Sequence, residues 1–351
     1  MGRQGIVFGM PPIRRMGEKK LIQHIRELAG RGPSVVTSLV TSLVKGIGDD
    51  CAVLRVPPGH DLLVTTDFTI ENVHFRRAWH PPELVGRRCL TRGLSDIAAM
   101  GGEPRAAFLS LAVAGDVPQK WVNGFLKGLV DLGREFKVPL AGGDTAQSAA
   151  GIQADIVVVG SVPKGKAILR SGAKPGQQIY VTGELGGAAA ALAGLMEADS
   201  GLKSGVRPGS KPAGAKYFRG STPQARVAVG QSLRRRGLAS AMIDLSDGLS
   251  TDLDHICQES HVGAQIEAAA IPRAHMGAVK KQVALDLALH GGDDYELLFT
   301  SAADVPEQIA GVRVTRIGRI LPSSGMRMQL IGADGKRQAL KPAGWEHFQG
   351  N

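Results

Sequence analysis

Apolar segments of strand length alternate with helical patterns along this chain, and acidic turns stand at the ends of many of the strands. Strands are expected at 61–70, 106–113 and 155–162, and helices at 17–28, 81–101 and 118–137. VPLAGGDT is expected to be a short strand that ends in a glycine turn, and AMIDLSDGL (241–249) repeats the plan of a strand, an acidic turn and a helix. This alternation predicts an α/β or α+β protein of two domains.

A domain boundary is expected near residues 164–174, where lysines, glycines and a proline interrupt the pattern. The sequence is therefore divided into an extension (1–18), an N-terminal domain (19–163) and a C-terminal domain (164–351). The C-terminal domain contains a basic segment, 203–222, that looks like an insertion or a divergent loop.

The net charge of +10 comes almost entirely from one region. Nine Lys and Arg residues and no Asp or Glu lie between Lys203 and Arg236. The part 203–222 is also rich in Gly, Ser and Pro, which predicts a solvated loop ahead of a helix. A polyanionic ligand could use such a loop, but charge confined to one loop argues against a nucleic-acid-binding function.

The three cysteines, Cys51, Cys89 and Cys257, are far apart and form no CxxC pair. Neither a disulfide framework nor a zinc site is expected, and a reducing compartment fits. No apolar run is long enough to span a bilayer, and no apolar segment follows Arg14 and Arg15 as a secretory signal requires. We expect a cytoplasmic protein without a membrane partner.

Six acidic turns carry most of the potential chemistry. They read GIGDDCAVL (46–54), TTDFTIENVHF (65–75), GLSDIAAMGG (93–102), GGDT (142–145), IDLSDGL (243–249) and GGDDYE (291–296). Carboxylates held together raise one another's pKa, so they stay ionised only beside cations. Mg²⁺ fits, because it prefers oxygen ligands and joins a few carboxylates to substrate phosphates. No cluster of His and Cys accompanies these turns, which disfavours a softer metal.

Glycines beside the acidic residues suit phosphate binding. Gly142 and Gly143 would let backbone N–H groups approach phosphate oxygens, and helices opening after Asp96 and Asp247 would present their N-termini to an anion. Each motif taken alone is more often a plain turn or a helix cap than a ligand site, whereas the ordered set of them favours a shared site. The chain has no GxxxxGK[ST] loop, no protein-kinase motif pair, no GxGxxG after a strand and no GxSxG.

Taken in order, the motifs GIGDDCAVL, TTD with a following His, LSDIAAMG, GGDT, LRSGAKPGQ, IDLSDGL and GGDDYELLF resemble those of the thiamine-monophosphate kinase family. The match runs from about Ile22 to Phe348. The resemblance implies a two-domain, aminoimidazole ribonucleotide synthetase-like architecture with mixed sheets flanked by helices. It implies a homodimer whose N-terminal domain binds ATP and Mg²⁺ and forms the dimer. It also implies phosphorylation of thiamine monophosphate to thiamine diphosphate, the last step of thiamine diphosphate biosynthesis.

The resemblance also assigns roles to residues. It implies metal ligands for several Mg²⁺ ions at Asp50, Thr65, Thr66, Asp67, Asp96, Asp144, Asp244 and Asp247. It implies ATP contacts at Gly143, Asp144, Arg170 and Ser246, and substrate contacts at His74, Asp293 and Trp345. Of these, Asp67, Asp96 and Asp144 are expected to matter most for catalysis, which we expect to be in-line phosphoryl transfer without a covalent enzyme intermediate.

Simple chemistry agrees with some of these roles. Arg170 is a cation beside a glycine turn and suits a phosphate. Trp345 could stack on a planar heterocycle and, with Asp293, favour a cationic thiazolium, although a lone Trp is more often a packing residue. His74 taken alone is as readily a packing residue as a ligand.

The chain departs from the family pattern at three positions. Gly93 stands where Asn is usual, Arg88 where Lys is common, and Asp293 where Glu is also usual, which shortens the reach of the side chain by one methylene. These departures concern the geometry of the substrate site, not the class of reaction.

Two other functions remain open. The first is another ATP-using enzyme of the same superfamily. A selenophosphate synthetase would require a reactive Cys near the N-terminus, whereas the first Cys of this chain is Cys51. Hydrogenase maturation would require a C-terminal Cys, whereas this chain ends HFQGN. A non-catalytic nucleotide-binding module would tolerate the loss of metal-binding aspartates, none of which is missing.

Overall fold

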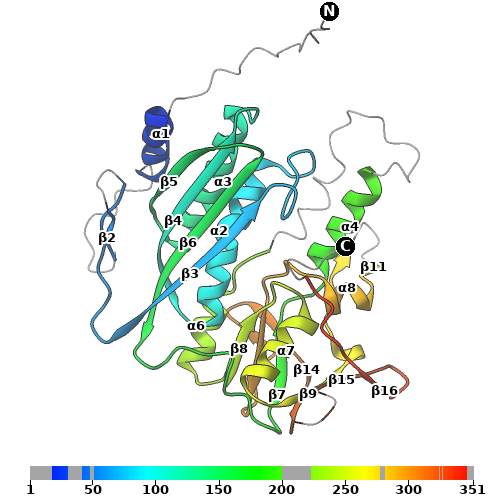
Figure 1. Cartoon of the computed structure of the whole chain (residues 1–351). Helices are drawn as coiled ribbons and strands as arrows, with labels where there is room; N and C mark the ends of the chain where they lie inside the picture. The colour runs from blue at the N-terminus through cyan, green and yellow to red at the C-terminus, as the bar shows by residue number, and fades with distance from the viewer. Residues whose placement is uncertain are drawn as a thin grey trace, which may run out of the picture.

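The computed structural model describes residues 18–30, 42–47, 51–199, 223–276, 281–323, 325 and 327–345. Asp50, residues 1–17 and the basic segment 203–222 lie outside these residues. The described chain forms two larger sheets with helices packed against them (Figure 1). Its small elements are β1 (Leu43–Lys45), β2 (Val53–Leu54), a 3-10 helix (Ala268–Ala270), β10 (His275–Met276) and β11 (Lys281–Gln282).

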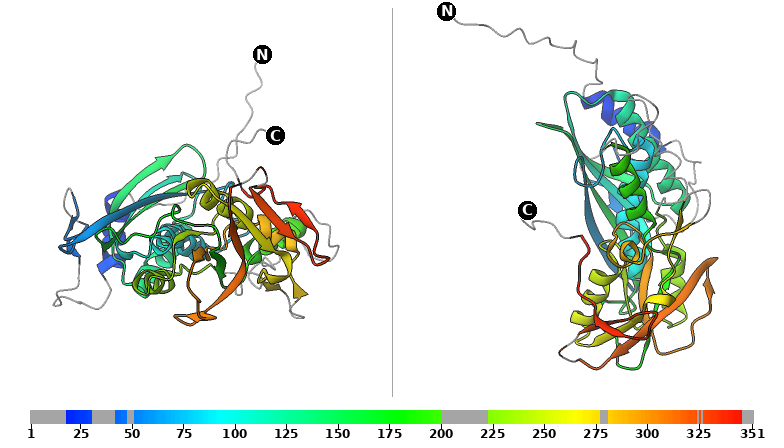
Figure 2. Two further views of the ribbon diagram at one scale, coloured as in Figure 1. Left: turned by 90° about the horizontal axis from the view of Figure 1, so that it is seen from below. Right: turned by 90° about the vertical axis from the view of Figure 1, so that its right-hand side faces the viewer.

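The N-terminal part is built on a four-stranded sheet with the strand order β3-β6-β4-β5. The strands are β3 (His60–Ile70), β4 (Glu103–Ala114), β5 (Leu140–Ser148) and β6 (Ile152–Pro163). β4 and β5 are parallel because helix α3 (Gln119–Phe136) connects them, and the other two pairs are antiparallel. Helices α2 (Pro82–Ala99) and α3 cover one face of this sheet, and α1 (Glu18–Gly30) packs beside α3 and β5 (Figures 1 and 2).

Glycines bring α2 and α3 into backbone contact. A Cβ atom on Gly86 would lie 1.9 Å from the carbonyl oxygen of Phe125, and one on Gly128 would lie 1.9 Å from that of Glu83. Any larger residue would push the two helices apart, since real Cβ atoms do not approach other atoms so closely. The two glycines therefore fix the position of α2, which carries Asp96.

The C-terminal part contains an eight-stranded mixed sheet with the order β16-β15-β9-β14-β7-β12-β8, with β13 added beside β14. Its strands are β7 (Gln178–Thr182), β8 (Ala241–Asp244), β9 (Gly263–Glu267), β12 (Leu297–Ser301), β13 (Gln308–Ile309), β14 (Val312–Leu321), β15 (Met328–Ile331) and β16 (Arg337–Ala339). Its helices are α4 (Gly187–Asp199), α6 (Val227–Arg235), α7 (Leu249–Glu259) and α8 (Leu285–His290). Helix α7 packs against β8, β9 and β12.

Helix α2 also joins the two parts. It contacts α6 and β8, and a Cβ on Gly230 of α6 would lie 2.0 Å from the carbonyl oxygen of Ala98. One hydrophobic core runs through this junction, with Leu94 of α2, Leu233 of α6 and Phe299 of β12 all fully buried. The C-terminal end of α2 is therefore packed closely as well, against α6 and β8.

The expected α/β architecture with mixed sheets and flanking helices is confirmed. Two local expectations were wrong. GGDT is not a turn, because β5 continues through it from Leu140 to Ser148. No helix opens after Asp96, because Asp96 lies in the last turn of α2. Within the described residues, no helix combines the length and the apolar character needed to cross a membrane.

Candidate active site

Three polar residues meet where β3 lies against α2. Thr65 and Asp67 are two residues apart on β3, so both side chains point to the face covered by α2. The Thr65 hydroxyl donates a hydrogen bond to Oδ2 of Asp96. Gly93 makes this contact possible, because a Cβ there would lie only 2.5 Å from Cγ2 of Val158 on β6. The glycine that replaces the usual Asn thus lets α2 lie close to the sheet.

Asp244 adds a third carboxylate, from the C-terminal part. It is the last residue of β8 and is 3 % exposed. Burial, followed by the charges of Asp96 and Asp67, raises the pKa of Asp244 to about 7. Burial and the charge of Asp96 likewise raise the pKa of Asp67 to about 7, and burial raises the pKa of Asp96. We call Asp67, Asp96 and Asp244 the carboxylate group; it lacks enough positive charge to stay fully ionised at neutral pH.

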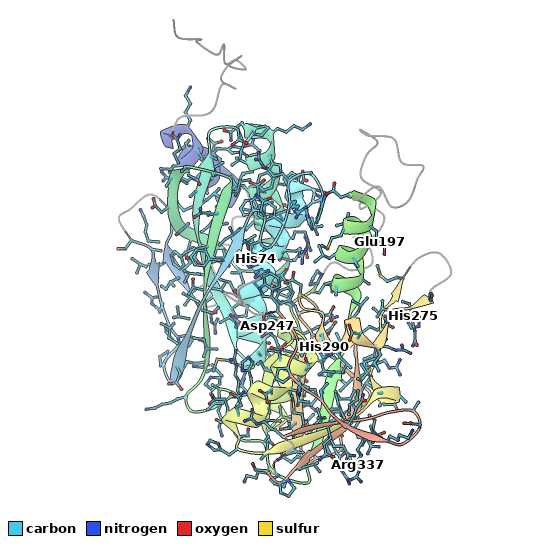
Figure 3. The ribbon with its side chains drawn as sticks, turned by 45° about the vertical axis from the view of Figure 1, so that its right-hand side comes forward. His74, Glu197, Asp247, His275, His290 and Arg337 are labelled. Atoms are coloured by element: carbon cyan, nitrogen blue, oxygen red, sulfur yellow. The ribbon has the colours of Figure 1, made fainter. Side chains whose placement is uncertain are left out.

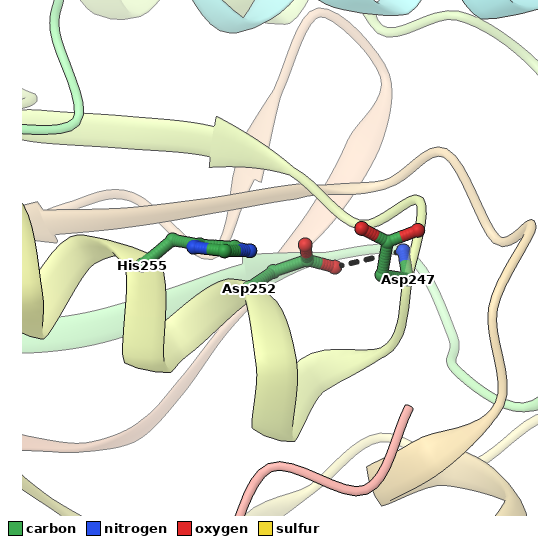
Figure 4. A group of neighbouring side chains, drawn as sticks. All are labelled: Asp247, Asp252 and His255. Carbon is green, nitrogen blue, oxygen red and sulfur yellow. Dashed lines mark hydrogen bonds between the residues drawn. The ribbon is translucent and has the colours of Figure 1, made fainter. Parts of the chain in front are cut away.

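The turn after β8 places Asp247 close to the carboxylate group. Asp247 contributes to the raised pKa of Asp67. The buried Asp252 carboxylate fixes this turn, because it accepts a hydrogen bond from the backbone N–H of Asp247 at 3.2 Å (Figure 4). It also accepts one from the backbone N–H of Gly248 at 3.1 Å. Ligand atoms of Asp247, Asp252 and His255 lie within 4.8 Å of one another. Asp247 therefore stands just before α7, as the sequence predicted.

Thr66 and Asp144 lie on the opposite, open face of the sheet. The Thr66 hydroxyl donates to Oδ1 of Asp155 at 2.5 Å. Asp155 pairs with Ser110 on β4, and Ser110 pairs with Asp144 on β5, so these side chains form a row across one face. Neighbouring strands are about 4.8 Å apart, which puts the Asp144 backbone about 10 Å from that of Asp155. The structure thus brings together the carboxylate group with Thr65, and leaves Thr66 and Asp144 on the open face.

A cavity of about 580 Å³ lies beside the GGDT segment, between α1, β4, β5 and the residues Gly46, Ile47, Cys51 and Ala52. Gly143 has φ 146°, and a Cβ there would lie 1.9 Å from the carbonyl oxygen of Leu109, so only glycine fits. The Asp144 carboxylate accepts from the Thr145 backbone N–H at 2.8 Å. Within the described residues, the buried Thr145 hydroxyl has no hydrogen-bond partner. The cavity therefore combines apolar walls with a polar edge.

A second polar group surrounds residues 291–295, which we call the Asp293 turn. Asp293 and Tyr295 both have left-handed backbones, with φ 67° and 52°. Backbone hydrogen bonds of 2.8 Å hold them, from Asp293 N to Ser246 O and from Tyr295 N to Leu245 O. The Tyr295 hydroxyl donates to Oδ1 of Asp293 at 2.8 Å. The turn is thus tied to Ser246 and so to the loop that carries Asp247.

Two arginines of α2 bind the Asp293 carboxylate. Nη2 of Arg88 lies 2.5 Å from Oδ2, and Nη2 of Arg92 lies 3.1 Å from Oδ1. Burial favours the neutral acid, but the charges of Arg88 and Arg92 outweigh it and lower the pKa of Asp293. Nη1 of Arg92 also lies 4.0 Å from Oδ1 of Asp67. Arg92 therefore stands between the Asp293 turn and the carboxylate group.

The other expected contact residues lie around the same region. His74 follows β3, and its Nδ1 accepts from the Ile70 backbone N–H at 3.0 Å, so the neutral ring carries its proton on Nε2. Figure 3 labels His74 and Asp247 in the zone where the two parts of the molecule meet. The backbone N–H of Trp345 donates to Asp247 O at 3.0 Å, and its indole is 54 % exposed.

Arg170 approaches the carboxylate group from the segment before β7. Its side chain is exposed, and its charge opposes the raised pKa of both Asp96 and Asp244. The Ser260 hydroxyl donates to its backbone carbonyl at 3.1 Å, which positions the segment. An exposed guanidinium next to buried carboxylates suits a ligand that carries phosphates.

Sequence reasoning missed Arg92, Tyr295 and Asp155. A signal existed for the first, because Arg88, Arg92 and Asp96 are spaced by four residues and share one face of a helix. Tyr295 lies within the predicted acidic turn GGDDYE, but a role was assigned only to Asp293. Asp155 was read as the start of an apolar strand, and only the register of β3, β6 and β4 places it beside Thr66.

Comparison with known proteins places this geometry in a family. Residues 48–162 match the family model of the AIR synthase related protein N-terminal domain, and residues 174–331 match the C-terminal domain of the same family. Thiamine-monophosphate kinase of Escherichia coli (strain K12) is 39 % identical over 316 residues, which cover 86 % of this chain and 91 % of the relative.

Two solved structures are also similar. The crystal structure of thiamine-monophosphate kinase from Stenotrophomonas maltophilia K279a has a TM-score of 0.71 and 32 % identity, and covers 92 % of this chain and 98 % of its own. A structure described as AaThiL complexed with AMPPCP and TMP has a TM-score of 0.68 and 27 % identity, and covers 97 % of this chain and 100 % of its own.

Proposed function

Because the chain belongs to the thiamine-monophosphate kinase family, a branch of the AIR synthase related proteins, we propose that it transfers the γ-phosphoryl group of ATP to the phosphate of thiamine monophosphate. The observation that carries this proposal is the carboxylate group, assembled from both parts of the molecule beside Arg92, Arg170 and the Asp293 turn. A site of this kind suits two anionic phosphates that must be brought together.

The donor set fits Mg²⁺. Asp67, Asp96 and Asp244 offer only oxygen. Burial raises the pKa of all three, and neighbouring carboxylates raise the pKa of Asp67 and Asp244 further; a bound divalent cation would favour the ionised form of each. We propose that these residues, Asp247 and Thr65 hold Mg²⁺ on the α2 side of the sheet, and that Thr66 and Asp144 on the open face, with Asp50, are ligands of further Mg²⁺ ions. Bound Mg²⁺ would neutralise phosphate oxygens and favour in-line attack.

The cavity beside β5 is the proposed place for the base of ATP. Its apolar walls and the orphaned Thr145 hydroxyl suit a planar heterocycle with polar edges. Gly143 leaves room for phosphates, and Arg170 and Ser246 are proposed to contact them. The related AaThiL structure is complexed with AMPPCP and TMP, which supports the same pair of ligands for this chain.

The acceptor is proposed to lie between the carboxylate group and the Asp293 turn. His74, Asp293 and Trp345 stand around this region from three separate segments of the chain. The phosphate of thiamine monophosphate is already an anion near neutral pH, so no strong general base is required. Residues that orient and neutralise the two phosphates, Asp67, Asp96 and Asp144, are therefore the proposed catalytic residues.

We also propose that the protein is a cytoplasmic homodimer. Leu62, Val64 and Phe68 on the open face of β3 are each more than half exposed. A row of large apolar side chains on one face of an edge strand is typical of a surface that another chain covers. The same face carries Thr66 and Asp144, so a partner subunit would close the GGDT side of the site.

The test is a direct assay of the purified protein with ATP, Mg²⁺ and thiamine monophosphate, with formation of thiamine diphosphate as the readout. Unphosphorylated thiamine is the control acceptor and should give no product. Asp67→Asn is expected to lower kcat by about 100-fold or more, because a ligand to the phosphate-orienting cations is lost, while the melting temperature stays within a few degrees. Turnover of thiamine but not of thiamine monophosphate would refute the proposed function.

A further inference from the structure

We propose that Arg92 is a specificity-determining residue that binds the phosphate of the phosphorylated acceptor and so selects it over the unphosphorylated form. This proposal rests on the proposed function. The acceptor's phosphate must reach the carboxylate group while its rings contact the Asp293 turn. Arg92 is the residue that contacts the turn and also approaches the carboxylate group.

The residue spacing along α2 places Arg92 between the Asp293 turn and the carboxylate group. Arg88, Arg92 and Asp96 are spaced by four residues, so they form one stripe along α2. The stripe begins at the Asp293 turn, where Arg88 binds, and ends at Thr65, where Asp96 accepts a hydrogen bond. A phosphate that lies between the two ends therefore lies beside the middle residue.

Arg92 has donors left for a ligand. Its Nη2 group is engaged by Asp293 at 3.1 Å, whereas Nη1 is 4.0 Å from Asp67, which is too long for a hydrogen bond. Within the described part of the chain, Nη1 and Nε make no hydrogen bond. The side chain is only 12 % exposed, so a hydrogen bond formed there is shielded from water. A planar guanidinium with N–H groups available on one edge can bind a phosphate through two parallel hydrogen bonds.

The contacts of Arg92 also hold the guanidinium in place before a ligand arrives. Asp293 fixes one edge, and the Tyr295 ring lies under the group, with Cζ 5.9 Å from the ring centroid. Arg88 satisfies the other oxygen of Asp293. Arg92 shares Asp293 with Arg88, and its other carboxylate neighbour, Asp67, is 4.0 Å away, so direct contacts neutralise the guanidinium only in part.

The experiment compares the unaltered protein with Arg92→Met, Arg92→Lys and the control Arg87→Met. Arg87 lies on the same helix but binds Glu135 on the outer surface, so its loss removes a cation without touching the site. Binding of thiamine monophosphate, thiamine and inorganic phosphate is measured by calorimetry, and the KM for ATP and the melting temperature are recorded for each variant.

Arg92→Met is expected to raise the Kd for thiamine monophosphate about 10- to 100-fold, with the Kd for thiamine and the KM for ATP changed less than about 3-fold. Arg92→Lys keeps a cation and should recover most of the lost affinity even if the Met variant folds poorly. Arg87→Met should match the unaltered protein. An equal loss for thiamine and thiamine monophosphate, or wild-type discrimination in folded Arg92→Met, overturns the proposal.

The two proposals can fail separately. If the unaltered protein makes no thiamine diphosphate, the proposed function is wrong, and inorganic phosphate alone then decides the role of Arg92. Phosphate binding that is lost in Arg92→Met and kept in Arg87→Met would uphold an anion site at Arg92. Phosphate binding unchanged in Arg92→Met would refute it.

Discussion

The ionised form of the buried carboxylates in the site is unfavourable when no cation is bound. Asp67 and Asp244 are each surrounded by carboxylates and shielded from water, which raises the pKa of both to about 7. Arg92 and Arg170 offset only part of the negative charge. Burying these carboxylates on folding therefore lowers the stability of the protein, and cations that bind to them should raise it again.

The raised pKa values predict a pH dependence of stability in the metal-free protein. A carboxyl group whose pKa is near 4 when unfolded and about 7 when folded holds its proton more tightly in the folded state. The free energy of unfolding in EDTA should therefore fall as the pH rises from about 4 to about 7, by up to about 4 kcal/mol for each of the two residues, and then level off. Thermal melts across this range measure the effect.

Matched variants decide whether these two residues are responsible. Asp244→Asn should make the fall smaller without abolishing it, because the pKa of Asp67 and, through burial, that of Asp294 are also raised to about 7. Asp286→Asn, at a carboxylate whose side chain is 84 % exposed, should leave the dependence unchanged. Excess Mg²⁺ should raise stability most at the upper end of the pH range. A metal-free protein whose stability rises between pH 4 and 7 would contradict the assigned cause.

At the scale of the elements, α2 decides how the site is built. It is packed backbone to backbone on α3 through Gly86 and Gly128, and on α6 through Gly230. Its stripe of Arg88, Arg92 and Asp96 then meets the Asp293 turn and β3 at the same time. Glycines at the helix contacts thus position α2, and the charged residues on its remaining face form the contacts of the site.

Gly128→Ala tests this dependence on close packing. The added Cβ would lie 1.9 Å from the Glu83 carbonyl oxygen, so α2 must move away from α3, at an expected loss of about 1–3 kcal/mol of stability. Activity should fall as well, because Asp96 moves with the helix. Denaturant unfolding and the thiamine diphosphate assay measure the two effects.

The control is Gly115→Ala, where an added Cβ meets nothing within 4 Å. It should change neither stability nor turnover appreciably. If Gly128→Ala were as stable as this control, the backbone contact between the helices would not be what holds α2.

Alternating apolar segments and acidic turns were sufficient to predict β3, α2, β4, α3 and β6 in order, but they gave no indication of the short helix α8 before the Asp293 turn. Local periodicity could not show that β5 continues through GGDT, because two glycines and an Asp read as a turn unless the partner strand β4 is known. The periodicity of 81–101 did predict the helix in whose last turn Asp96 lies; only the Ser-Asp motif, which is also typical of a helix N-cap, suggested that a helix opens after Asp96. Contacts such as Thr66 with Asp155, 89 residues apart, depend on strand register alone.

For the whole molecule, the exposed apolar face of β3 predicts association. Leu62→Lys places a charge in that face and should shift the protein from dimer to monomer, because a buried unpaired charge weakens an interface strongly. Analytical ultracentrifugation measures the change. Leu192→Lys, at a similarly exposed Leu on α4, should leave the association state as it was.

The loss of the dimer should also affect the reaction, since the proposed partner covers the face that holds Asp144. A monomeric Leu62→Lys protein with full turnover would show that each chain works alone. If the unaltered protein is itself monomeric in the ultracentrifuge, the proposed homodimer is refuted.

The attachment of α2 at both of its ends has a consequence for how the sequence can change. Each residue of an α-helix turns the chain by about 100° and advances it by 1.5 Å. Inserting a single residue between Arg92 and Asp96 would therefore rotate one end of the stripe away from its partners, whatever residue was inserted. The identities of the outward-facing residues are free to vary, but the number of residues between the two anchored ends is not.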